Sequence, residues 1–279
     1  MLDFQLFRLK VFRIPGSLFS TEDSSASLVR SAVLSRPERK SRQGVVWHVG
    51  NVEPIDDAAL YLAFGRTTRA NLPLFNAADR SFVEQEFESA PFTHVIVDTE
   101  LGLCAIARKT QLASITNILA RHLNRVLNDS PPAYEKNVRF AIEPIADPEQ
   151  FIEQLRQAQS VLGFSITFSL PNPFDANADF QLPMERLLQE AEGTKGKTSI
   201  SGPHLDPDVL EELSRSAAAT GNDASAKLYR EGDPRPVSKR LRENLVSVSV
   251  SEVTNAEARI EVLEILRRLY LRIRHSLNG

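Results

Sequence analysis

The chain has 279 residues, a formal net charge of -3 and 42% hydrophobic residues. This length and composition exclude wholesale disorder and fibrous repeats, and they predict one large or two small domains. No apolar run approaches the roughly 20 residues that a bilayer span needs, and residues 1–12 mix charges with apolar side chains, unlike a signal peptide. The single cysteine, Cys104, excludes an internal disulfide framework. We therefore expect a cytoplasmic protein that does not insert directly into a membrane.

In the first half of the chain, the hydrophobic pattern predicts strand pairs and two helices. Even-numbered residues from Phe4 to Phe12 share one side of an expected first strand, Leu9 and Val11 share the other, and Pro15-Gly16 ends the strand. The next expected elements are a helix over 20–34, a strand pair at 44–53 and 58–66, a hairpin of strands at 92–97 and 103–107, and a helix over 111–127.

In the second half, helix starts are marked by capping chemistry. An acidic cap followed by proline satisfies the first amides and fits the first helical turn, and a Thr-x-x-Glu spacing forms a capping box. These starts are Asp147-Pro148 for a helix over 148–159, Asp206-Pro207-Asp208 for a helix ending at Gly221, and Thr254 with Glu257 for the last helix. Strands are expected at 138–144 and 163–170.

The order of these elements predicts an α+β fold. We expect mixed sheets built from β-hairpins and βαβ-like units, with a long amphipathic helix at the C-terminus. Three parts are expected: an N-terminal α+β region at 1–170, a linker or mobile arm at 171–202, and a C-terminal α/β region at 203–279 that ends in a basic amphipathic helix. The linker is placed where Pro171-Asn172-Pro173 and the glycines and lysines of 193–197 interrupt the pattern.

The sequence carries no recognisable catalytic or metal-binding motif. The five histidines stand outside any HExxH-type frame, and the tightest group, His204 with Asp206 and Asp208, is better explained by the helix cap. His94 is interpreted as a satisfied or surface histidine. Cys104 lies in an apolar stretch, which indicates a buried, inert thiol. We therefore predict no catalytic residues, no metal site and no cofactor.

Two segments carry weaker signals. Residues 193–197 contain glycine and lysine without a P-loop frame, which indicates a flexible loop. Glu84, Glu86 and Glu88 would lie on one side of a strand, and clustered carboxylates suit a metal-dependent nuclease, but no lysine accompanies them. A solvent-facing edge strand that resists aggregation explains these glutamates better.

Basic residues are concentrated near the two ends of the chain. Residues 91–192 carry 8 basic and 13 acidic residues, whereas residues 193–279 carry 14 and 12. The runs at 235–242 and 267–275 contain no acidic residue, and Pro234 and Pro236 predict that the first of these runs is a loop. The residues expected to contact DNA are Arg36, Arg39, Lys40, Arg42, Lys195, Lys197, Arg235, Lys239, Arg240, Arg242, Arg267, Arg268, Arg272 and Arg274.

The last helix can both pack and bind. Apolar residues such as Val262, Leu266 and Ile273 fall in one arc, and the arginines of 267–274 fall in the opposite arc. Arginine forks match phosphate oxygens, and each phosphate contact releases counterions. Since few aromatic residues accompany the basic runs, stacking on single-stranded bases is not indicated. A sequence-tolerant contact with double-stranded DNA fits better.

Several short stretches resemble the RexA family of phage-exclusion proteins found in prophages. They are the hairpin at 93–108, the strand Val138 to Pro144, the strand end Leu170-Pro171, and Val253 to Glu257 at the start of the last helix. This resemblance implies a homodimeric, non-enzymatic α+β protein that binds DNA with little sequence preference and acts with a membrane channel partner. The N-terminal third, including Trp47, has no counterpart in the family pattern.

Three functional hypotheses follow. The first is a double-stranded DNA-binding sensor of an anti-phage defence system that works with a membrane effector. The second is a metal-dependent nuclease or toxin component that uses carboxylates such as Glu84, Glu86 and Glu88. The third is a protein-interaction scaffold whose basic helix binds an acidic partner. We favour the first, because the basic runs near the C-terminus are free of acidic residues.

Overall fold

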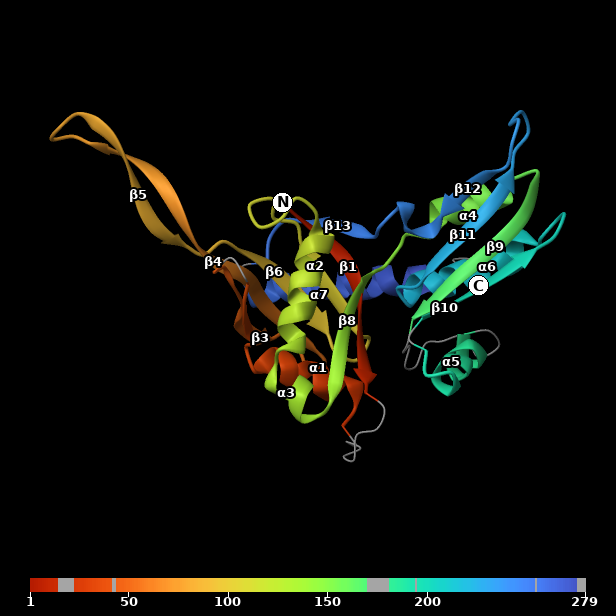
Figure 1. Cartoon of the computed structure of the whole chain (residues 1–279), viewed down its shortest axis with the longest axis horizontal. Helices are drawn as coiled ribbons and strands as arrows, with labels where there is room; N and C mark the ends of the chain where they lie inside the picture. Colours follow the sequence, from red (N-terminus) through yellow and green to blue (C-terminus); the bar gives the residue numbers. More distant parts are fainter. Residues whose placement is uncertain (15–22, 42–43, 170–180, 194, 254, 275–279) are drawn as a thin grey trace.

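The computed structural model of the chain describes residues 1–14, 23–41, 44–169, 181–193, 195–253 and 255–274. Within these ranges the chain forms two antiparallel sheets with helices on their faces, which confirms the α+β prediction (Figure 1). None of the described helices is both long and apolar enough to cross a bilayer.

The first sheet contains nine strands. They are β1 (Leu2–Arg13), β2 (Glu38–Lys40), β3 (Val46–Pro54), β4 (Ala59–Asn76), β5 (Ser81–Ser89), β6 (Phe92–Asp98), β7 (Leu103–Ala107), β8 (Val138–Pro144) and β13 (Ser247–Val250). The order is β13-β1-β7-β6-β4-β3-β2, with β8 also on β1 and β5 on β4. The β3–β4 and β6–β7 hairpins confirm the two strand pairs predicted from the sequence.

Helices cover both faces of this sheet. The helices α1 (Ser25–Leu34), α2 (Thr116–Asn128) and α3 (Pro131–Glu135) lie on one face, where Leu9 and Val11 of β1 are buried. The other face carries Phe4 and Leu6 and is covered by α7 (Ala256–Arg274). The two faces of β1 are therefore divided as its alternating sequence predicts. Pro15-Gly16 and residues 20–22 of the expected first helix lie outside the described residues.

The β4–β5 hairpin extends beyond the sheet as a two-stranded ribbon (Figure 1). Residues 68–76 of β4 pair with 81–89 of β5, so the ribbon leaves the body after β4 has passed β3 and β6. Apolar side chains on the ribbon are exposed, for example Leu72 at 50% and Phe82 at 81%. Phe75 and Phe82 contact each other near the tip, at 5.2 Å between ring centroids.

The second sheet has the order β10-β9-β11-β12. Its strands are β9 (Ser160–Ser169), β10 (Lys195–Ser201), β11 (Asp223–Tyr229) and β12 (Val237–Arg240). One face is covered by α4 (Glu149–Arg156) and α6 (Pro207–Ala219), with α5 (Gln181–Glu190) beside β9 and β10. The short helix η1 (Leu241–Glu243) follows β12. Asp206 caps α6, and Gly221 after the helix has φ +66°, as the sequence predicts.

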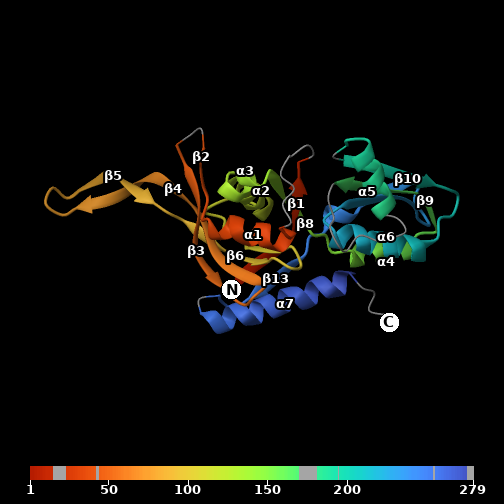
Figure 2. The same ribbon diagram turned by 90° about the horizontal axis from the view of Figure 1, so that it is seen from below.

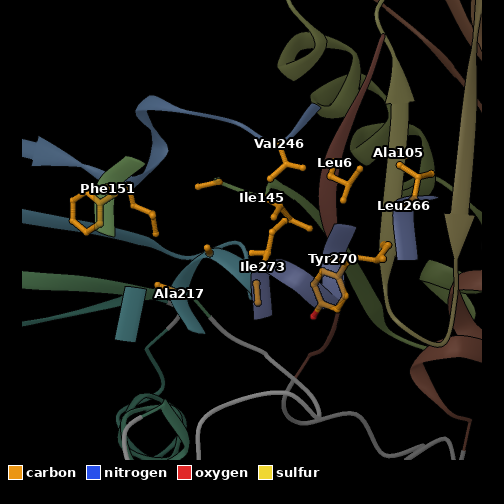
Figure 3. Packing of buried hydrophobic residues seen from close by; sticks show 14 of the residues in the cluster. Leu6, Ala105, Ile145, Phe151, Ala217, Val246, Leu266, Tyr270 and Ile273 are labelled. Carbon is orange, nitrogen blue, oxygen red and sulfur yellow. The ribbon is translucent and has the colours of Figure 1, made fainter. Parts of the chain in front are cut away.

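A single hydrophobic cluster joins the two sheets. Figure 3 shows Leu6 and Ala105 of the first sheet, Leu266 and Ile273 of α7, and Ala217 of α6 in one continuous layer. In Figure 2, α7 runs along one side of the molecule beneath the first sheet, and its C-terminal end reaches α6. The helix therefore links the first sheet to the helix layer that covers the second sheet.

Charged groups fasten α7 to the first sheet. Arg267 donates from Nε to Asp98 at 2.6 Å and from Nη1 to Asp56 at 2.9 Å. The Asp98 side chain is only 2% exposed. Farther along the helix, the Tyr270 hydroxyl accepts a hydrogen bond from the buried Arg8 at 2.8 Å. Arg267 and Arg8 are thus part of the helix–sheet contact.

The division into parts differs from the one that the sequence predicted. The expected linker, 171–202, contributes α5 and β10 to the second sheet, although 170–180 and 194 lie outside the described residues. β9 belongs to the second sheet rather than to the N-terminal region, and β13 and α7 return to the first sheet. The boundaries between the two sheets depend on hydrogen bonding and packing between distant segments, which the local sequence does not reveal.

Replacing Arg267 by alanine should lower the free energy of unfolding by about 3 kcal/mol, because it leaves the buried Asp98 without a cation. Urea denaturation measures the change. Arg268→Ala is the matched control, since this exposed arginine lies one residue away and should shift the value by less than about 0.5 kcal/mol. Equal effects of the two substitutions would contradict the anchoring role.

Stability should also depend on Glu149 at acidic pH. Arg215 donates to Glu149 at 2.8 Å, and this hydrogen bond lowers the pKa of Glu149 below its ordinary value of 4.5. The unfolded chain therefore takes up the proton first, so the contribution is complete above the ordinary pKa and is lost as pH falls through the folded pKa.

We expect Glu149→Gln to reduce the loss of stability between pH 6 and the acid range, as measured by urea denaturation across that range. Glu153→Gln is the control on the same helix, because Glu153 is exposed and hydrogen bonds to Gln157 rather than to an arginine. Parallel pH profiles for Glu149→Gln and the parent chain would refute this prediction.

Candidate nucleic-acid interface

The strands of the second sheet have one apolar and one polar face. In β9, Phe164 and Ile166 are buried beneath the helices, whereas Ser165 and Thr167 alternate with them and point to the other side. We call this second side the open face. Its residues are Gly163, Ser165, Thr167, Lys195, Lys197, Ser199, Ser201, Asp223, Ser225, Lys227, Tyr229, Ser238 and Arg240.

The register aligns these residues in rows across the four strands. One row runs Ser199, Ser165, Ser225, Arg240, and the next runs Ser201, Gly163, Lys227, Ser238. A third row contains Lys197, Thr167 and Asp223. The hydroxyls of Ser165 and Ser225 hydrogen bond to each other at 2.9 Å. The rows bring together basic residues from three separate segments of the chain.

The open face is strongly basic for a chain of net charge -3. It carries four cations, Lys195, Lys197, Lys227 and Arg240, against one carboxylate, Asp223. Within the part of the chain that the structure describes, none of the four cationic side chains forms an ion pair. The Glu243 carboxylate, in η1, accepts a hydrogen bond from the Arg240 backbone amide. These side chains remain available to a polyanion.

A shallow groove of about 210 Å³ crosses the centre of the open face. The side chains that line it are mostly hydroxyls, including Ser165, Ser199, Ser201, Ser225 and Ser238, together with Lys227. Serine hydroxyls and lysine ammonium groups are donors to phosphate oxygens. The arrangement can therefore contact phosphates.

The remaining residues of the 235–242 run are less available. These residues form strand β12 and the helix η1 rather than a loop, contrary to the sequence prediction. Lys239 shares the covered side with Ala226. Arg242 donates to the Gly221 carbonyl and lies 3.7 Å from Glu143. Arg235, in contrast, is exposed in the loop before β12.

Only some of the arginines in the predicted basic arc of α7 are exposed. Arg267 is bound to two carboxylates, and Arg274 is half-buried. Arg268 and Arg272 are exposed, but the exposed side of the helix also carries Glu257, Glu261 and Glu264. The exposed side of the helix is therefore not continuously basic. The prediction considered only residues 267–275 and left out the acidic residues of the preceding turns.

The N-terminal basic run lies elsewhere in the molecule. Arg39 and Lys40 are in β2, at the edge of the first sheet, and Arg36 is exposed just before it. Arg39 binds both oxygens of Asp129 at 2.8 Å. Arg42 lies outside the described residues. The structure thus gathers Lys195, Lys197 and Arg240 of the predicted set on one face, and the other described members of the set lie elsewhere in the molecule.

The residues that the sequence analysis considered for metal binding or acid–base chemistry make structural contacts. Among the described residues, no group of three or more His, Cys, Asp or Glu side chains is arranged to hold a metal ion. Asp206 accepts from the Asp208 amide at 2.9 Å as the cap of α6. His94 accepts or donates to the Tyr61 hydroxyl at 2.8 Å, and burial lowers its pKa. These contacts confirm the cap and the satisfied histidine.

The three glutamates of β5 lie on the exposed ribbon. The strand pairing places Glu84, Glu86 and Glu88 on one side, as their spacing predicts, and all three are exposed. Glu86 is 3.5 Å from Arg69 across the ribbon. Negative side chains on a free strand disfavour pairing with another copy of the same edge, which agrees with the edge-strand interpretation.

Lys227 is the open-face cation that the sequence analysis missed. The sequence did contain a signal for this face. Polar residues recur at every second position, as Lys195, Lys197, Ser199 and Ser201 in one segment and as Ser225 and Lys227 in another. This period of two is typical of a strand with one polar face. The glycines near Lys195 led instead to the prediction of a flexible loop, which is wrong because Lys195–Ser201 form β10.

Comparison with known proteins gives no independent assignment. No protein-family model and no curated protein matches the chain. The family resemblance noted in the sequence is therefore a prediction that rests on its short motifs alone.

The thiol of Cys104 should be unreactive in the folded protein. Cys104 is fully buried in β7, and burial raises its pKa to about 12. Since the thiolate is the reactive form, a thiol reagent at neutral pH should label the chain only after unfolding in urea. Mass spectrometry before and after unfolding measures the labelling. Rapid labelling of the folded chain would contradict the buried position of β7.

Proposed function

We propose that the chain binds double-stranded nucleic acid through the open face of the second sheet, by contacts to phosphates rather than to bases. The observation that carries this proposal is the set of four cations and six serine or threonine hydroxyls aligned on one exposed face with a single carboxylate. Phosphate contacts give affinity without sequence preference, because the backbone is common to all sequences.

The dimensions of the face suit two phosphate backbones. Lys195 and Lys197 lie on β10, and Arg240 lies on β12, three strand spacings away, or about 14 Å measured across the strands. This distance is close to the roughly 12 Å width of the major groove of B-DNA. The cations at the two edges of the face could therefore contact both strands of a duplex, while the serines between them donate to the nearer phosphates.

The scarcity of aromatic residues on the open face supports a duplex ligand, since Tyr229 at the end of β11 is the one ring on that side of the described strands. Phe164 and Phe168 of β9 are buried on the opposite side of the sheet. Proteins that bind single strands on a sheet usually stack bases on exposed aromatic rings. The second sheet presents lysine, arginine and serine instead. A role in phage exclusion, a homodimer and a membrane channel partner remain predictions from the family resemblance.

The test uses fluorescence anisotropy with two duplexes of unrelated sequence. Neutralising four phosphates predicts that affinity falls about 100-fold between 50 and 200 mM salt. The triple variant Lys195→Ala, Lys197→Ala, Lys227→Ala should weaken binding to both duplexes alike by roughly tenfold or more, and it should make the salt dependence shallower by about one unit of slope per lost contact.

The matched control is the double variant Arg268→Ala, Arg272→Ala, which removes exposed positive charge from α7. It should change affinity much less than the open-face variant. A larger loss in the α7 variant, or a flat salt response of the parent chain, would overturn the proposal. Cleavage of the duplex upon addition of magnesium would favour the nuclease hypothesis instead.

A further inference from the structure

A second concentration of positive charge lies on the first sheet, at the opposite part of the molecule from the open face. Arg39 in β2, Trp47 in β3 and Arg66 in β4 are directly paired across three strands, so their side chains point to the same side. That side is covered by α2, which contributes Arg121 and Arg125. We call Arg39, Arg66, Arg121 and Arg125 the arginine cluster.

An aromatic stack forms the centre of the cluster. The His122 ring of α2 lies on the Trp47 ring at 4.2 Å between centroids and 14° between planes. Trp47 is only 4% exposed, and its ring also stacks against Phe64 at 5.1 Å. The Arg66 guanidinium is 5.9 Å from the centroid of Trp47. Because Trp47 is packed in the core, the stack is a rigid element beside which the arginines lie.

The positive charge of the cluster is poorly compensated. Asp129 is the one carboxylate that forms an ion pair with any of its four arginines in the described ranges. Arg121 and Arg125 are exposed and form no hydrogen bond or ion pair with a described residue. The Nε of Arg66 is buried without a hydrogen-bond partner. Burial and the four nearby arginines lower the pKa of His122, so the local potential is positive.

We propose that the arginine cluster is a binding site for phosphate groups, with the Trp47–His122 stack as its floor. Guanidinium forks bind phosphate oxygens in pairs, and all four basic side chains of the cluster are arginines. A phosphate ligand would relieve the mutual repulsion of the arginines. This site does not depend on the open face, because it is formed by β2, β3, β4 and α2 of the other sheet.

His122 supplies a direct readout of the site. An anion bound among the arginines favours the protonated imidazole, so the pKa of His122 should rise when the ligand binds. The pKa is measured by NMR from the pH dependence of the His122 ring signals, which are assigned by comparison with His122→Gln. The probes are inorganic pyrophosphate and a short thymidylate oligonucleotide, each added to the full chain.

The test variant is Arg121→Ala, Arg125→Ala. Both side chains are exposed and form no described ion pair, so the fold should be retained. Loss of two charge-assisted contacts should weaken probe binding by at least about tenfold. Arg186→Ala, which removes an exposed arginine from the helix α5, is the control and should bind as the parent chain does. The open-face variant should also respond normally, which separates the two sites.

The two probes distinguish whether the phosphate belongs to a small molecule or to a strand of nucleic acid. A rise in the pKa of His122 with pyrophosphate supports a site for small phosphates, and a rise with the oligonucleotide alone supports a strand of nucleic acid. Unchanged His122 signals at millimolar concentrations of both probes would overturn the proposal. It would also fail if the Arg121→Ala, Arg125→Ala variant responded like the parent chain, or if only an acidic peptide shifted the signals.

Discussion

The contacts of α7 with the first sheet and with α6, which covers the second sheet, are the constraint on which the structure depends. Ion pairing of Arg267 with Asp98 fixes the helix on the first sheet, and Tyr270 and Ile273 carry the hydrophobic cluster toward α6. The cost of burying Asp98 is offset only while Arg267 is in place. A helix that joins two sheets in this way cannot offer all of its arginines to a ligand. The exposed Arg268 and Arg272 share the outer side of α7 with Glu257, Glu261 and Glu264, so the more strongly basic surfaces lie away from this helix.

Local signals predicted much of the fold, whereas the site depended on long-range pairing. Asp206 caps α6 and Gly221 ends the segment because both effects act within one turn of the chain. The open face forms only when β10 and β11 pair with β9 on its two edges. Lys195 and Lys227 are distant in the sequence, and no local rule places them on the same face of one sheet. The partner of Arg267 was unpredictable for the same reason, since Asp98 is distant in the sequence.

Charge balance distinguishes structural arginines from those that are available to ligands. Arg215 is enclosed by Glu149 and Glu211, and Arg267 by Asp98 and Asp56. Arg121, Arg125 and the cations of the open face have no such described partners. The net charge of -3 does not reveal these basic surfaces, because many acidic residues form internal ion pairs or lie on the β4–β5 ribbon. Runs of basic residues in a sequence therefore overstate some surfaces and miss others that assemble across strands.

The position of Trp47 has a consequence for observing the protein. Trp47 is the single tryptophan of the chain, and it lies beneath His122 in the first sheet. Tryptophan emission therefore reports the first sheet rather than the second. A protonated imidazole in contact with an indole ring quenches its fluorescence, so the brightness of the native protein follows the charge state of one histidine. The fold thus contains an optical sensor of local potential that needs no added label.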